Sequence, residues 1–126
     1  MSSTTVTNLA KQKMLLARAG DRTLPKITGM AFGNGGVNSS DVVINHSPSD
    51  NALYNEVLRK PVESHEAVSS TRIRYRCTIG ANELNGIYIS ECGIYDDEGD
   101  FVALKSFRKK GKDEDTEVIF ECDDMF

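Results

Sequence analysis

Alternating apolar and polar residues mark the clearest strand of this sequence, from Thr71 to Ile79. Every second side chain of an extended strand points to the same face, so this segment has one apolar and one basic face. The apolar face carries Ile73, Tyr75, Cys77 and Ile79. The basic face carries Arg72, Arg74 and Arg76. We expect a strand that is buried on one side only.

Other apolar runs predict further strands at residues 26–32, 87–95, 101–107 and 116–122. An acidic turn at 96–100 separates two of them, and Gly99 at a turn position predicts a β-hairpin. Residues 109–115 read as a charged loop. Residues 37–50, rich in Asn, Ser and Asp, predict a surface loop with a short strand inside it.

Two segments have the apolar spacing of helices. Residues 6–19 predict an N-terminal helix, capped by Thr5 or Thr7 and stopped by Gly20. Residues 51–59 predict a second, short helix that Pro61 closes. The predicted class is therefore α+β, with an antiparallel β-sheet and two helices packed on it. We find no long linker and expect a single domain over residues 1–126.

The predicted N-terminal helix carries three basic residues of interest. Lys11 and Arg18 share its outer face, which is either a solvated basic face or a docking surface. Lys13 falls within the apolar arc, so it must extend to solvent or find a partner.

Composition excludes several classes of protein. The 126 residues are 39% hydrophobic and 27% charged, and no run approaches the ~20 apolar residues that span a bilayer. Residues 1–7 lack the basic and apolar parts of a secretion signal, so we expect synthesis in a cytoplasm and no membrane partner. The net charge is −4, and the acidic surplus lies in residues 64–126, which argues against nucleic-acid binding.

Residues suited to catalysis are few. The three cysteines fall within apolar or alternating runs and have no metal-site spacing, so we expect buried free thiols. The best nucleophile and base would be Cys77 and His65, but Cys77 should point into the core. His46 lies in a polar loop. We predict no catalytic residues.

Two motifs imitate ligand sites. Residues 33–36 read Gly-Asn-Gly-Gly but lack the Gly-Lys-Ser/Thr ending of a phosphate loop, so we expect a turn with positive φ angles. The acidic turn at residues 96–100 lacks the spacing of a calcium loop. We predict no cofactor and no metal.

The arginine row leaves two interpretations open. Three like charges on one strand face require acidic partners, either on a neighbouring strand or on another subunit. Residues 113–126 contain seven acidic residues and no basic one, and they could act in either way. The candidate subunit interface therefore comprises Lys11, Lys13, Arg18, Arg72, Arg74 and Arg76.

Several segments, taken in order, resemble the phage tail-collar fibre family. The matching segments lie at residues 10–20, 24–27, 30–37 and 53–60, and most clearly at 91–103. In the last, Glu91-Cys92-Gly93-Ile94-Tyr95 leads into Asp-Asp-Glu-Gly-Asp and a strand, with Cys92 where the family more often has Ile. The sequence is most similar to the short form carried by prophages and phage-tail-like bacteriocins of Gram-positive bacteria.

This resemblance implies a structural part of a virion or phage-like tail, made in the host cytoplasm and located at the baseplate. It implies binding to other tail subunits and to a tail fibre protein, and a homo-oligomer, with a trimer expected. Because the sequence ends at Phe126 without a shaft or receptor-binding tip, we expect a connector between baseplate and fibre. The alternative is a ligand-binding module for surface glycans, which would need exposed aromatic side chains around a groove.

Overall fold

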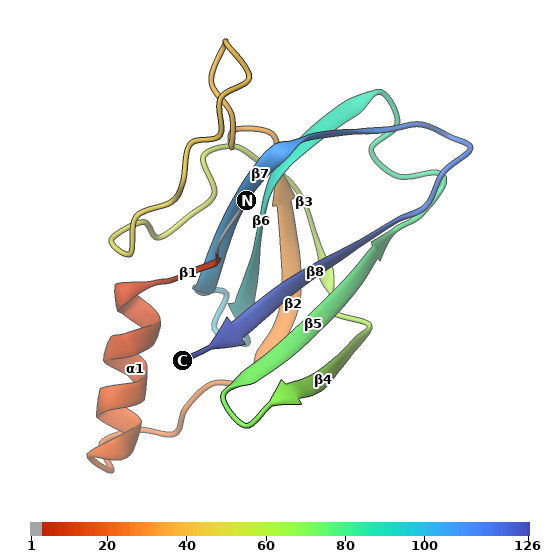
Figure 1. Cartoon of the computed structure of the whole chain (residues 1–126). Helices are drawn as coiled ribbons and strands as arrows, with labels where there is room; N and C mark the ends of the chain where they lie inside the picture. Colours follow the sequence, from red (N-terminus) through yellow and green to blue (C-terminus); the bar gives the residue numbers. More distant parts are fainter. Residues whose placement is uncertain (1–3) are drawn as a thin grey trace.

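The computed structural model describes residues 4–126, which form eight β-strands and one α-helix. The strands make two antiparallel sheets that pack against each other, and the helix stands beside them (Figure 1). The predicted class, α+β with two helices on one sheet, is therefore wrong. The described chain is mostly β, with a single short helix.

The larger sheet has the strand order β1-β7-β6-β2-β3 and the smaller one β4-β5-β8. The strands of the larger sheet, in chain order, are β1 (Thr4–Val6), β2 (Ile27–Gly33), β3 (Glu56–Pro61), β6 (Ile87–Asp96) and β7 (Phe101–Lys112). The strands of the smaller sheet are β4 (Ser64–Ser69), β5 (Arg72–Ile79) and β8 (Val118–Met125). The predicted hairpin is confirmed as β6 and β7, and Gly99 lies in its turn at φ 85°.

The main core lies between the sheets. Alternate residues of β2 and β6 meet alternate residues of β5 and β8, as the period of an extended strand requires. Its fully buried members include Met30, Phe32, Cys77, Ile94 and Cys122. All three cysteines are free and buried, as predicted.

The helix α1 (Asn8–Arg18) begins later than predicted, because residues 4–6 pair with β7 as strand β1. Thr7 is the N-cap and accepts a hydrogen bond at Oγ1 from Ala10 N at 3.1 Å. Gly20 follows the helix at φ 83°, as predicted for its C-terminal stop. No helix of the described residues is long and apolar enough to cross a membrane.

The predicted helix at 51–59 is wrong. Residues 51–55 belong to a loop, and Glu56–Pro61 is strand β3 at the edge of the larger sheet, paired with β2. Leu53 packs beneath the loop with Ala31 and Leu104, whereas Leu58 packs against the main core. The apolar residues of this segment therefore make two separate contacts and do not form one helical face. Short apolar runs do not distinguish a helix from a strand.

The other differences concern strand length and edges. β7 continues to Lys112, through half of the predicted charged loop, because residues 110–112 pair with 87–89. The edge strand β4 was not predicted, and its residues are all exposed. Within the 37–50 loop the predicted strand is only an isolated bridge between Val37 and Val43.

Candidate functional site

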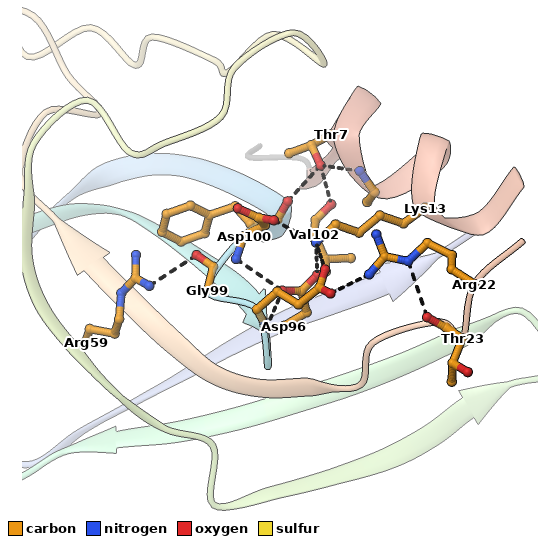
Figure 2. A network of polar contacts seen from close by, with 12 residues as sticks. Thr7, Lys13, Arg22, Thr23, Arg59, Asp96, Gly99, Asp100 and Val102 are labelled. Atoms are coloured by element: carbon orange, nitrogen blue, oxygen red, sulfur yellow. Dashed lines mark hydrogen bonds and ion pairs between the residues drawn. The ribbon is translucent and has the colours of Figure 1, made fainter. Parts of the chain in front are cut away.

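Lys13 lies where the acidic β6–β7 turn meets helix α1 (Figure 2). Its side chain is buried, and Nζ lies 2.7 Å from Asp96 Oδ2, 2.8 Å from Glu98 Oε1 and 2.7 Å from Asp100 Oδ2. The partner required by its position in the apolar arc is thus an acidic turn of the same chain. This ammonium fastens α1 to the larger sheet.

The acidic turn is organised around Asp96, which is buried. Its Oδ1 accepts hydrogen bonds from the backbone N–H groups of Glu98 and Asp100 at 3.0 and 3.1 Å, while Oδ2 faces Lys13. Ligand oxygens of Asp96, Glu98 and Asp100 lie within 4.8 Å of one another, close enough to hold a cation. The Lys13 ammonium places a positive charge among these oxygens.

Charge–charge contacts shift the pKa values of this cluster. Burial alone would lower the pKa of Lys13, but hydrogen bonds to Asp100, Asp96 and Glu98 outweigh it and hold that pKa above its usual value. The Arg22 guanidinium, with Lys13 beside it, lowers the pKa of Glu98 to about 2. On the other side of the turn Arg59 donates to Gly99 O at 3.3 Å (Figure 2). The turn is therefore held from both sides.

A second polar centre surrounds Glu91, a fully buried carboxylate in the middle of β6. Oε2 accepts from the backbone N–H of Gly35 at 3.0 Å and of Asn55 at 2.9 Å. Oε1 accepts from the backbone N–H of Tyr54 at 2.9 Å and lies 2.9 Å from His46 Nε2. One carboxylate thus secures both ends and the middle of the loop between β2 and β3.

His46 connects Glu91 to Asp50. Its Nδ1 lies 3.0 Å from Asp50 Oδ2, and its ring stacks on Tyr54 with centroids 4.2 Å apart. Burial alone would lower the pKa of His46, but the Glu91 and Asp50 carboxylates outweigh it and raise that pKa. Burial would raise the pKa of Glu91, but His46 and the three amides hold it below its usual value. Both shifts favour the charged forms, an imidazolium beside a carboxylate.

The glycines at residues 33–36 fit this centre by size. The predicted positive φ angles are wrong, since among the described glycines only Gly20, Gly86 and Gly99 have them. A Cβ on Gly35 would lie 2.6 Å from Tyr54 Cβ, and one on Gly36 would lie 2.1 Å from Ser90 O. These glycines let the loop backbone approach β6 closely enough to reach Glu91.

The arginine row of β5 finds its partners within the chain. Arg74 stands opposite Asp123 of β8, with Nε 2.9 Å from Oδ1, and Arg76 stands opposite Glu121, with Nε 2.8 Å from Oε2. Arg76 also pairs with Glu66 of β4. Arg72 lies 3.6 Å from Asp123. Cross-strand pairing, one of the two interpretations, therefore describes this row.

The remaining candidates lie apart from these centres. Lys11 and Arg18 are exposed on the outer face of α1. Burial raises the pKa of the Cys77 thiol to about 11, and its Sγ faces Pro61 O at 3.6 Å. His65 instead lies against Tyr75, with ring centroids 5.5 Å apart. The structure thus does not bring Cys77 and His65 together as a nucleophile and base.

Sequence reasoning missed the Glu91 and His46 centre. The available signal was a single acidic residue within the apolar strand 87–95, which in a buried strand requires a partner. His46 and the glycines gave no such signal, because their partner lies more than forty residues away along the chain.

The described residues thus form two packed sheets, and the clusters around Lys13, Glu91 and the arginine row hold the helix, a loop and neighbouring strands in place. The sequence model of the phage tail-collar fibre protein N-terminal domain matches residues 1–121, and the chain belongs to this family. It is a structural part of a phage tail fibre, located in the virion tail and associated with other tail components. Searches of curated proteins and of solved structures gave no match.

Proposed function

We propose that this chain joins tail fibres to the baseplate of a phage or phage-like tail. The family match over residues 1–121 carries the proposal. In this role the chain acts as one domain over residues 1–126, binds a baseplate subunit and a tail fibre protein, and performs no catalysis. It is made in the host cytoplasm and incorporated at the baseplate.

The outer face of α1 is the proposed contact surface. Lys11 and Arg18 are exposed there, and Leu15 between them is 63% exposed. An apolar side chain flanked by two cations suits an acidic partner surface with an apolar centre. Lys13, the third basic residue of the predicted helix, is buried on the opposite face of α1, where it holds the helix on the acidic turn.

The arginine row remains in the proposal in a secondary role. Arg72, Arg74 and Arg76 are partly exposed but already face acidic partners in the same sheet. A subunit that binds there must bring polar groups that add to these ion pairs. If it displaced an acidic partner instead, one arginine would be left without a counter-charge.

We also propose a homotrimer, the state implied by the family resemblance. Light scattering on the purified chain tests this state directly. A trimer would give three times the 13.9 kDa of one chain.

Glycan binding is the alternative function. The exposed tyrosines are Tyr54 and Tyr88, 47% and 57% exposed. Tyr54 is stacked on His46, and Tyr88 lies on β6 beneath Lys109. A glycan array with the purified chain tests this alternative, and saturable binding to a surface saccharide would support it.

Complementation of a deletion strain tests the attachment role. Tails made without this chain should have baseplates that lack fibres, and the wild-type chain should restore them. The double variant Lys11→Glu and Arg18→Glu should restore few fibres. The matched double variant Arg108→Glu and Lys110→Glu, on exposed residues of β7, should restore them. Fibres on tails without the chain would refute the proposal.

A further inference from the structure

The last residues of β8 extend beyond the core. On its inner face Phe120 and Cys122 are buried between the sheets, and the same alternation brings Asp124 and Phe126 to that face. Figure 1 shows this end of the chain beside α1. At this end of β8, the larger sheet therefore no longer covers the inner face of the strand.

A groove of about 370 Å³ lies between α1, the segment before β2 and this end of β8. We call it the α1–β8 groove. Its lining includes Met14, Leu24, Ile27, Tyr75, Phe126 and Asp124. A second hollow of about 670 Å³ shares Met14 and Phe126 with it and extends to Leu15 and Arg18. The groove is therefore continuous with the proposed contact surface on α1.

Asp124 places a carboxyl group, without a partner among the described residues, in this mostly apolar groove. Its Oδ1 atom is buried and finds no hydrogen-bond partner among residues 4–126. Burial raises the pKa of its carboxyl group. Lys13, Lys26, His65 and Asp96 also line the groove, but Lys13 and Asp96 bind each other in the acidic turn. Within the described residues, no Lys, Arg or His nitrogen lies within 4.0 Å of the Asp124 carboxylate, whereas Asp123 next to it pairs with Arg74.

Large apolar side chains are exposed along the same groove. Phe126 is 72% exposed and Leu24 is 50% exposed. Exposed apolar surface that surrounds a polar group without a partner is typical of a binding site, because a ligand can cover the surface and satisfy that group.

We propose that the α1–β8 groove receives an apolar segment of another tail subunit, and that this segment brings one ammonium or guanidinium group to Asp124. Charge complementarity selects this occupant: an acidic segment would meet Asp124 with like charge, and a wholly apolar one would leave its carboxylate without a partner. The inference rests on the proposed role in joining tail subunits, and it adds the chemistry of the segment that is bound.

The chemistry of the groove can be tested without any tail. The probe is n-hexylammonium, added to the ¹⁵N-labelled chain, with n-hexanol as the uncharged control. Saturable amide shifts should appear at Met14, Ile27 and Tyr75 with hexylammonium. Asp124→Asn should weaken this binding about tenfold, because it removes a charged partner. Equal binding of hexanol, equal binding by Asp124→Asn, or no saturable shift would overturn the assignment.

Incorporation into tails tests the occupant. Phe126→Asp should reduce the amount of chain in purified tails at least tenfold, and Ile119→Asp should not. Ile119 is a matched control because it is 64% exposed on β8, the strand that Phe126 directly follows. Light scattering of the isolated variants separates a second copy from another subunit. If Phe126→Asp abolishes self-association, the groove binds a second copy and the proposal is wrong.

The two tests also separate this inference from the attachment role. Hexylammonium binding depends only on the groove, so its absence overturns the inference and leaves fibre attachment untouched. Conversely, fibres on tails that lack the chain would refute the attachment role, whatever the probe shows.

Discussion

His46 Nε2 lies 2.9 Å from Glu91 Oε1, and both side chains are buried beneath the loop between β2 and β3. Glu91 also accepts three backbone N–H groups of that loop. One carboxylate therefore makes four of the polar contacts between this loop and the larger sheet, and it belongs to the segment where the family resemblance is clearest.

Glu91→Gln should destabilise the fold by about 3 kcal/mol, since it removes the carboxylate that faces His46 and turns an amide donor toward backbone N–H groups of the loop. Urea unfolding measures the change. Glu121→Gln is the control, because its carboxylate is exposed on β8 and the loss should be much smaller. Equal losses for the two variants would contradict the central role of Glu91.

The Glu91 and His46 pair should contribute most to the free energy of unfolding within a limited pH range. A histidine with a raised pKa contributes fully below its ordinary value of 6.5, and the contribution is lost as pH rises through the raised value. A carboxylate with a lowered pKa contributes above its ordinary value of 4.5, and the contribution is lost as pH falls through the lowered one. The pair is therefore most stabilising between these limits.

Thermal unfolding of the wild type and of His46→Gln, across pH, measures this window. The difference in stability between the two should be largest at about pH 5–6.5 and should shrink on the alkaline side. A difference that is constant across pH would show that the His46 proton makes no contribution.

Lys13→Met should cost about 2–3 kcal/mol, because the buried Asp96 and its neighbour Asp100 would lose their cation, while Glu98 would keep one, Arg22. Lys11→Met is the matched control on the same helix, where Lys11 is exposed, and should change stability by less than about 0.5 kcal/mol. Adding Asp100→Asn to Lys13→Met should recover part of the loss. Denaturant unfolding of the four proteins tests this, and no recovery would argue against charge repulsion as the cause.

Arg74→Glu should lower the melting temperature, because it sets two acidic side chains opposite each other on β5 and β8. The reversed pair, Arg74→Glu with Asp123→Arg, should regain most of the loss. If Arg74→Glu alone leaves both the melting temperature and tail incorporation unchanged, the row is only a solvated face.

The local features of this fold could be predicted where the sequence pattern is long and regular. The alternation at residues 71–79 gave both the strand and its arginine face, and Thr7 and Gly20 gave the limits of α1. The helix predicted at residues 51–59 was wrong because its three apolar residues, Leu53, Val57 and Leu58, fit a helix as well as a loop followed by a strand. The short edge strand β4 has no apolar face and left no pattern.

The polar centres divide in the same way. The position of Lys13 within an apolar arc indicated that this side chain needs a partner. It did not indicate that the partner is the turn at residues 96–100. The Glu91 centre depends on contacts between residues far apart in the chain, which no local pattern contains. Prediction from one sequence therefore found the elements better than the contacts that join them.

Antibody–gold labelling of this chain on purified tail particles tests the central claim most directly. Attachment of fibres at the baseplate predicts gold at the distal end of the tail, at the roots of the fibres. Particles that carry fibres but no gold, or gold along the whole tail tube, would contradict it.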